Sequence, residues 1–231
     1  MLDRDEKPGV APDGPAVAPQ AAYLGSLMEP HLPFAPDDLQ HALNHNQIAC
    51  KTWLLDALFD ALGGRFATVT VLGGWYGVLG ALLLGDDRFQ VDRVLSYDLD
   101  PDCARVAEWL NRKHTPDGRF QAVTADVREL DYERLDGRVA APGATGNGAQ
   151  APDLVINTSC EHITPTEAWY GRIPPETLQV LQSNDYFDCP DHVNCQSDIE
   201  AFKADQPMRE LYYQGSMARK RYTRFILIGR K

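Results

Sequence analysis

The sequence predicts an α/β fold: a mostly parallel sheet of seven strands, with helices on both faces and an antiparallel hairpin at the C-terminal end. Three observations predict it. A run of β-branched and aliphatic residues stops at a glycine pair and passes at once into an apolar helical pattern. Further apolar runs follow, and each ends in polar residues. Two strand-like runs separated by a short polar turn stand near the end of the chain.

Length and charge limit the classes of function. The chain has 231 residues, which suits one domain and a tail, and 44% of them are hydrophobic, enough for a real core. The net charge of -11 argues against nucleic-acid binding, because affinity for phosphates comes from lysine and arginine. No apolar run approaches the roughly 20 residues that span a bilayer, and the N-terminus lacks a signal-peptide core. We expect a cytoplasmic protein that binds neither nucleic acid nor membranes.

The cysteines predict neither a disulfide framework nor a metal centre. Their number is five, and an odd count in a chain of this length fits reduced thiols. Cys189, His192 and Cys195 stand at short spacings, with Cys160 and His162 upstream. A structural zinc needs four well-placed ligands, and the paired C-x-x-C spacing is missing. We therefore expect no metal.

The chain begins with two segments that precede the main domain. Residues 1–22 are rich in proline, glycine, alanine and aspartate and are expected to form a flexible tail. Residues 23–64 are expected to form a helical lid, in which Asp37 or Asp38 caps a helix that stops at the glycine pair after Leu62. The polar stretch at 44–47 interrupts the apolar pattern. It is either a solvated helix face or a helix break that turns polar groups over the crevice.

The main domain, residues 65–231, is expected to be arranged around the stretch 68–80. Residues 68–72 predict a buried strand, Gly73 and Gly74 a tight turn, and the apolar residues from Val78 a helix. Glycine suits a turn that needs positive φ and lets a ligand approach the backbone. The helix start offers free N–H groups to a polar ligand.

Polar residues follow the next predicted strands. Asp98 follows the strand at 91–97, Asp126 follows the strand at 120–124, and Asn157 follows the strand at 153–156. Because ligands bind at the carboxyl ends of the strands in an open parallel sheet, we expect these side chains to converge on one crevice. Between them, 101–113 predicts a packing helix and 138–152 a flexible surface loop.

The last third of the chain completes the sheet. Residues 177–182 predict a fifth strand, and 210–214 with 222–228 predict the closing hairpin. Its turn is basic, with Arg219, Lys220 and Arg221 followed by Arg224, and is expected to be a solvated connection.

This order of elements resembles the class I S-adenosylmethionine-dependent methyltransferases over roughly residues 66–229. The resemblance implies a Rossmann-like fold with S-adenosylmethionine as cofactor. By that resemblance, Gly73, Gly74 and Gly77 border the amino-acid part of the cofactor, Asp98 accepts the ribose hydroxyls, and Asp126 meets the adenine amino group.

One position departs from the family's glycine pattern. Trp75 stands where the family usually has glycine. Trp75 and Tyr76 either cover the cofactor's sulfonium, because an aromatic face attracts a cation, or pack against the lid helix.

The fourth strand tip is where this fold usually places its acceptor chemistry. It does not match the Asn-Pro-Pro-aromatic tip that is typical of enzymes methylating exocyclic base amines. Glu161 and His162 are adjacent, so in a helix only one is expected to face the crevice. His162 is either a general base or a structural, capping histidine. The candidate catalytic residues are Asn157, Ser159, His162 and Tyr186.

The predicted reaction is methyl transfer to a small polar molecule, because the chain has no separate substrate domain. A second resemblance, to the azetidine-2-carboxylate synthases, implies that S-adenosylmethionine itself is cyclised with release of methylthioadenosine. Trp75, Tyr76, Tyr186 and Asn157 would then hold the folded cofactor. A non-enzymatic protein with this fold is a third alternative, which Asp98 and Asp126 argue against. The sequence does not predict the oligomeric state.

Overall fold

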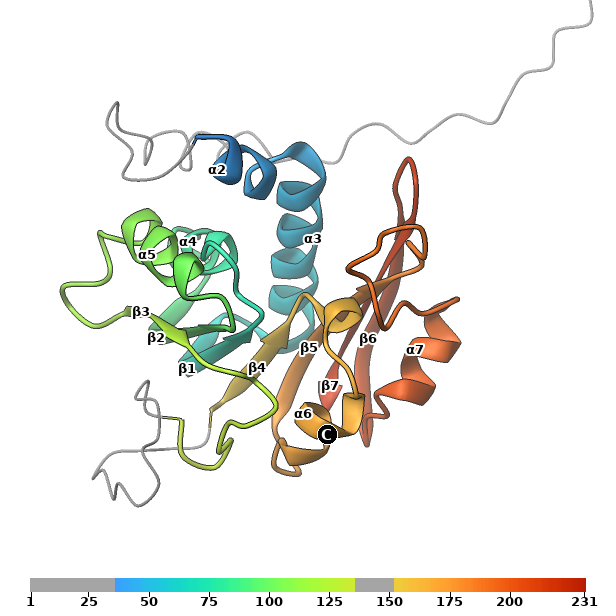
Figure 1. The fold of residues 1–231 in the computed structure, drawn as a ribbon. Helices are drawn as coiled ribbons and strands as arrows, with labels where there is room; N and C mark the ends of the chain where they lie inside the picture. Colours follow the sequence, from blue (N-terminus) through green and yellow to red (C-terminus); the bar gives the residue numbers. More distant parts are fainter. Residues whose placement is uncertain (1–35, 136–151) are drawn as a thin grey trace, which may run out of the picture.

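The structure, a computed structural model, describes residues 36–135 and 152–231 (Figure 1). The tail predicted at 1–22, the first part of the segment predicted at 23–64 and nearly all of the loop predicted at 138–152 lie outside the described residues. Within the described ranges, no helix combines the length and apolar character that crossing a membrane requires. The cytoplasmic location stays a prediction.

A single seven-stranded sheet forms the centre of the molecule, as predicted. Its strands lie in the order β3-β2-β1-β4-β5-β7-β6. The first five are parallel to one another, and β7 runs antiparallel to both β5 and β6. The strands are β1 Arg65–Leu72, β2 Gln90–Asp98, β3 Phe120–Thr124, β4 Leu154–Asn157, β5 Leu178–Asn184, β6 Glu210–Ala218 and β7 Thr223–Arg230.

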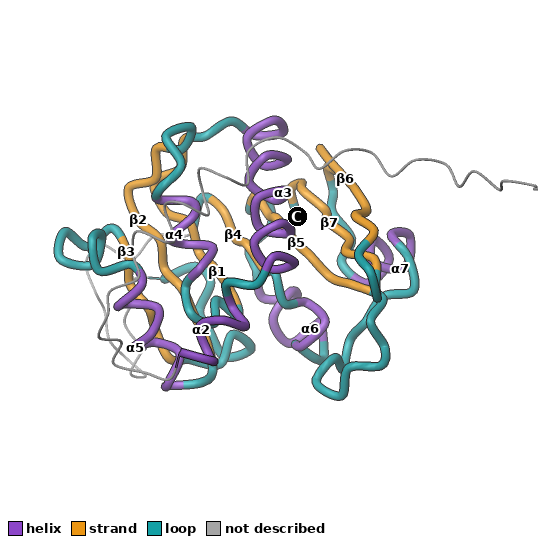
Figure 2. Tube along the Cα trace, turned by 90° about the horizontal axis from the view of Figure 1, so that it is seen from above, coloured by secondary structure: helices purple, strands orange, loops and turns teal. Residues whose placement is uncertain are grey.

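Helices cover both faces of the sheet, which confirms the predicted fold class. The helices are α2 Pro36–Ala42, α3 His45–Leu62, α4 Val78–Leu84, α5 Pro101–Leu110, α6 Thr166–Trp169 and α7 Ile199–Asp205, with 3₁₀ turns η1 Cys160–His162 and η2 Tyr170–Arg172. Seen from above, α3 crosses the middle of the molecule, with β1 to β3 on one side and β5 to β7 on the other (Figure 2).

Alternate residues of the inner strands belong to two separate hydrophobic cores, one on each face of the sheet. In β7, Ile226 and Ile228 join the core under α3, α4 and α5, whereas Leu227 joins the core that holds Trp169 of α6 and Phe202 of α7. This alternation follows from the two-residue repeat of a strand. Because both faces are buried, the central strands are mostly apolar, although β5 also buries Gln179 and Gln182.

The polar stretch 44–47 is a helix break. The continuous helix expected from residue 37 or 38 is interrupted at 43–44, because Asn44 caps α3 instead of continuing α2. Its side-chain oxygen accepts a hydrogen bond from the backbone N–H of Gln47 at 3.0 Å. The other end agrees with the prediction: α3 stops at Leu62, and Gly63 follows with a φ of 75°. The break therefore gives α3 its own start at His45, six residues before Lys51.

Candidate functional site

A cavity of about 620 Å³ opens where β1 and β4 lie side by side. From this pair, the chain moves outward to β2 and β3 on one side and to β5 and β7 on the other, so the crevice lies at the topological switch point of the sheet. Its volume is in the range of small-molecule sites. Residues after β1, β2 and β3 line one half, and residues of α3, the β4 exit and β7 line the other.

The glycine turn after β1 is shaped by two close contacts. Gly73 has a φ of 62°, which favours glycine. A Cβ added to Gly74 would lie 1.9 Å from the hydroxyl oxygen of Ser96 in β2. Gly77 also has a positive φ, of 70°, and a Cβ there would lie 3.1 Å from the Ala107 backbone of α5. Gly73 and Gly74 line the cavity, whereas Gly77 lies outside its lining and lets α4 approach α5.

Trp75 takes up the left-handed backbone conformation, with a φ of 48°. This conformation is uncommon for a residue with a large side chain. Its backbone N–H donates to the carboxylate of Asp98 at 2.7 Å, which ties the turn to the end of β2. The Trp75 ring stacks on that of Tyr76, with centroids 4.9 Å apart. Both residues line the cavity and also pack against the core beneath α3.

The two predicted acidic tips also line the cavity. Asp98 accepts hydrogen bonds from the backbone N–H groups of Trp75 and Asp100, one on each oxygen. Asp126 is held by the Arg128 side chain, with distances of 2.9 Å and 2.6 Å to its two oxygens. Hydrogen bonds from Arg128 keep the pKa of Asp126 below its ordinary value. Oδ1 of Asp126 already accepts both the backbone N–H and Nε of Arg128, at 2.9 Å each. Both oxygens of Asp98 and Oδ2 of Asp126 keep a lone pair that could accept a ligand's hydroxyl or amino group.

The β4 exit places Ser159 at the cavity and Asn157 behind it. Asn157 is fully buried and outside the cavity lining, and its side-chain oxygen accepts the backbone N–H of Ser159 at 2.8 Å. The Ser159 hydroxyl donates to the carbonyl of Gly73 at 3.3 Å. Asn157 thus shapes the turn that presents Ser159. The sequence predicted that Asn157 itself would reach the cavity, and the structure does not place it there.

Glu161 and His162 both line the cavity, so the expectation that only one of them would face it is wrong. They form part of the three-residue turn η1, in which Glu161 is buried and His162 exposed. The cavity therefore contacts the turn both on the side of the buried Glu161 and on the side of the exposed His162. His162 is fixed through Nδ1, which lies 3.0 Å from the carbonyl oxygen of Asp191.

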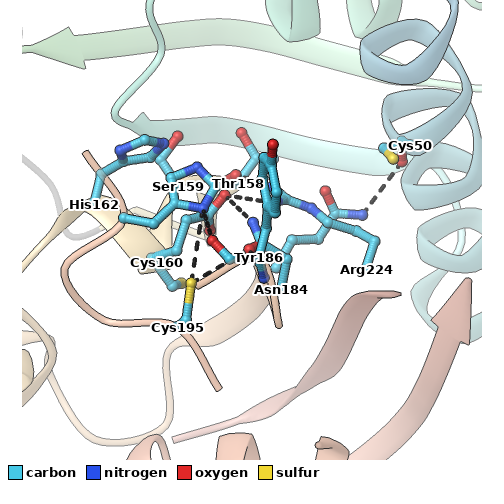
Figure 3. Close-up of polar contacts among 12 residues, drawn as sticks. Cys50, Thr158, Ser159, Cys160, His162, Asn184, Tyr186, Cys195 and Arg224 are labelled. Carbon is cyan, nitrogen blue, oxygen red and sulfur yellow. Dashed lines mark hydrogen bonds and ion pairs between the residues drawn. The ribbon is translucent and has the colours of Figure 1, made fainter. Parts of the chain in front are cut away.

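A buried ion pair between Glu161 and Arg224 lies in the wall of the cavity, and Figure 3 labels Arg224. Nη1 of Arg224 lies 2.5 Å from Oε1 of Glu161, and the same oxygen accepts the Asn184 side-chain amide at 2.7 Å. Arg224 also donates to the carbonyl of Thr158. Arg224 is 9% exposed, so it does not belong to the solvated basic turn with which the sequence grouped it.

Two cavity residues were missed by sequence reasoning, although their positions gave a signal. Lys51 of α3 precedes Leu54, Leu55 and Leu58 by three, four and seven residues, which places it on the buried stripe of the helix. Arg224 alternates with Ile226 and Ile228 in β7, which places it on the face that α3 covers. A charged residue on a buried face is the signal that could have found both.

Tyr186, the remaining predicted catalytic residue, lies outside the cavity lining. Its ring stacks on that of Tyr222, with centroids 5.8 Å apart, and its carbonyl oxygen lies 3.2 Å from Nδ1 of His192. Its backbone N–H donates to the Asn184 side chain at 2.9 Å, and Figure 3 shows these two residues side by side.

Comparison with solved structures identifies the fold. The structure is similar to that of the N-methyltransferase NodS from Bradyrhizobium japonicum in complex with S-adenosyl-L-homocysteine, with a TM-score of 0.59 and 11% identity over 91% of this chain and 98% of that one. It is also similar to the geranyl diphosphate C-methyltransferase from Streptomyces coelicolor, with a TM-score of 0.54 and 12% identity over 90% and 88% of the two chains. Neither a family model nor a curated protein matches the sequence. At such low identity the likeness establishes the fold of these methyltransferases.

Proposed function

We propose that the protein binds S-adenosylmethionine and transfers its methyl group to a small polar acceptor. One observation carries the proposal: a single cavity at the switch point joins the glycine turn and Asp98 to a second half lined by Lys51, Glu161 and His162. The first half has the groups that would hold a nucleoside and an amino-acid chain. The second half has charged and polar groups that would hold another molecule.

The residues of the first half fit the cofactor. The backbone at Gly73 and Gly74 has no side chain in the way of a ligand, and Asp98 would accept the ribose hydroxyls. Asp126 would accept the adenine amino group. Trp75 and Tyr76 would present aromatic faces that attract a cation. When bound, S-adenosylmethionine supplies an electrophilic methyl group on a positively charged sulfur.

The residues of the second half would bind and orient the acceptor. At neutral pH, Lys51 would attract an anionic group, and Ser159 would offer a hydroxyl. The bond from Nδ1 of His162 to a carbonyl oxygen leaves Nε2 with its lone pair in the neutral ring, so His162 could accept the acceptor's proton. Asn157 would act only by positioning Ser159.

Cyclisation of S-adenosylmethionine to azetidine-2-carboxylate is the alternative reaction, and one experiment separates the two. The purified chain is incubated with S-adenosylmethionine alone and then with fractionated metabolite extracts, and the products are identified by mass spectrometry. We expect S-adenosylhomocysteine to form only when an acceptor is added. Methylthioadenosine and a four-membered cyclic amino acid formed from the cofactor alone, above its spontaneous breakdown, would establish the cyclase.

Cofactor binding is tested separately by calorimetry. Asp98→Asn should weaken S-adenosylmethionine about 100-fold or more, because hydrogen bonds to a charged group contribute about 1.5–3 kcal/mol each. Asp100→Asn is the matched control: Asp100 caps α5 and lies outside the cavity lining, so its variant should keep the affinity. Equal affinities for wild type and Asp98→Asn would remove the ribose assignment. No binding by wild type would overturn the proposed function.

A further inference from the structure

Three side chains with metal-binding atoms meet beside the second half of the cavity. Glu161 and His162 come from η1, and His192 comes from the loop between β5 and α7. One ligand atom of each lies within 4.8 Å of the other two. The two imidazole rings meet edge to face, with centroids 4.6 Å apart. Glu161 and His162 also line the cavity, so an ion held by the three residues would stand beside a bound molecule.

Both histidines are oriented as metal ligands usually are. Nδ1 of His162 lies 3.0 Å from the carbonyl oxygen of Asp191, and Nδ1 of His192 lies 3.2 Å from that of Tyr186. A carbonyl oxygen only accepts, so each Nδ1 carries the hydrogen and each neutral ring keeps its lone pair on Nε2. Histidines that bind metals commonly donate the other ring N–H to a backbone carbonyl in this way.

Glu161 supplies a carboxylate oxygen that lacks a partner. Its residue is 3% exposed, and Oε1 is occupied by Asn184 and Arg224. Among the described residues, the buried Oε2 has no hydrogen-bond partner. A buried carboxylate oxygen left without a partner costs free energy, and a bound cation would remove that cost.

We propose that Glu161, His162 and His192 bind a divalent transition-metal ion. Two imidazole nitrogens and one carboxylate oxygen are the ligand set of many catalytic zinc sites, which keep a further coordination position open. Nitrogen ligands favour such an ion over Mg²⁺ or Ca²⁺. Tetrahedral zinc ligands stand about 3.4 Å apart, so the widest separation among the three ligand atoms, up to 4.8 Å, must close by about 1.4 Å when an ion binds.

The neighbouring cysteine is not part of this ligand set. Sγ of Cys195 lies 3.7 Å from Nδ1 of His192, on the side of the ring that faces the Tyr186 carbonyl. An ion bound at Nε2 of His192 would stand on the other side of the ring from this sulfur. The sequence-based expectation of no metal weighed His162 and His192 together with the cysteines around them, whereas this site combines the two histidines with Glu161.

Metal binding is measured on the full chain without a polyhistidine tag. The protein is treated with a chelator, dialysed, and titrated with Co²⁺ followed by visible absorption, and with Zn²⁺ followed by calorimetry. We expect one ion per chain and an absorption spectrum typical of Co²⁺ with nitrogen and oxygen ligands. Because this readout needs neither S-adenosylmethionine nor an acceptor, the result does not depend on the proposed methyl transfer.

Variants identify the ligands. His162→Ala and His192→Ala should each lower the affinity at least about 100-fold, since loss of an outer partner alone costs 10–100-fold. His45→Ala, an exposed histidine at the start of α3, and Cys195→Ser should bind as the wild type does. Circular dichroism checks that each variant is folded.

Three outcomes would overturn the site: no saturable binding by the wild type, unchanged affinity in both histidine variants, or loss of binding in Cys195→Ser. If the ion is bound, Nε2 of His162 is a ligand and cannot also accept a proton. A further assay compares methyl transfer by metal-free wild type and metal-free His162→Ala. If only the wild type is active, His162 acts as the base in the metal-free form alone.

Discussion

The ammonium group of Lys51 sits in surroundings that disfavour its charge. The residue is 9% exposed, and Nζ donates to the side chain of Gln47 at 2.6 Å. Burial lowers the pKa of Lys51 to about 8, and the positive charge of Arg224 acts in the same direction. At neutral pH the group therefore keeps its proton, at a cost to the folded state. An anionic group on a bound acceptor would offset that cost.

This cost predicts that wild type and Lys51→Met differ in their free energy of unfolding, and that the difference depends on pH. In the unfolded chain the pKa of Lys51 returns to 10.5, so between pH 8 and 10.5 the unfolded state binds more protons and stability rises with pH. Below pH 8 the full cost is present. Lys51→Met should therefore be more stable than wild type at pH 7, by up to about 3 kcal/mol, and the difference should shrink by pH 10.

Urea denaturation of both proteins at pH 7 and pH 10 measures this difference. Other groups that titrate in the same range contribute equally to both proteins and cancel. A difference that is the same at the two pH values would show that the Lys51 ammonium is not held in a desolvated site.

At the scale of the element, the turn between β1 and α4 shows what a sequence pattern reveals and what it does not. The strand, the glycine pair and the helix were all predicted correctly, because periodicity and glycine placement are local properties. The left-handed conformation of Trp75 was not predicted, because it depends on a hydrogen bond to Asp98, which is 23 residues away. Gly77 was assigned to the cofactor, but it lies outside the cavity lining, and its close approach to Ala107 gives it a packing role.

The fit of this turn against β2 is testable through Gly74→Ala. The new Cβ would lie 1.9 Å from Oγ and 3.2 Å from Cβ of Ser96, so the turn must shift or the serine must move. We expect a loss of about 1–3 kcal/mol in the free energy of unfolding, typical of overpacking, and weaker cofactor binding. The double variant Gly74→Ala/Ser96→Ala should recover part of the stability and part of the cofactor affinity, because it lacks the Ser96 Oγ that lies nearest to the new Cβ.

Gly171→Ala is the matched control for this substitution. An added Cβ there has no atom within 4 Å among the described residues, so its stability should change by less than about 0.5 kcal/mol. Denaturation midpoints and calorimetry are compared across the four proteins. If Ser96→Ala failed to relieve Gly74→Ala, the strain would lie in the backbone of the turn and not in this contact.

At the scale of the whole molecule, the sequence predicted the elements but not the side chains that meet between them. Of the strand tips predicted to converge, Asp98 and Asp126 line the cavity, whereas the tip after β4 reaches it through Ser159 and not through Asn157. The pairing of Glu161 with Arg224 was not predictable, because it depends on β7 entering the sheet between β5 and β6. With β7 antiparallel, its first residues lie at the same edge as the last residues of β4 and β5.

The buried pair therefore joins three neighbouring strands at the cavity edge. Glu161 follows β4, Asn184 ends β5, and Arg224 lies near the start of β7. Arg224→Met leaves the Glu161 carboxylate buried with only Asn184 as a partner, and we expect it to lower the free energy of unfolding by about 3–5 kcal/mol. The double variant Glu161→Gln/Arg224→Met buries no charge, and its amide oxygen can still accept from Asn184, so it should recover most of the loss.

Urea denaturation in the presence of a chelator tests this expectation without any contribution from bound metal. The two variants and the wild type should show similar m-values, so that differences in midpoint report stability. Recovery in the double variant would mean that the pair holds this edge of the sheet together but adds little stability beyond a neutral replacement, as is common for buried ion pairs. A double variant as unstable as Arg224→Met would instead mean that the bond from Arg224 to the Thr158 carbonyl, and not the ion pair, secures the β4 exit beside the cavity.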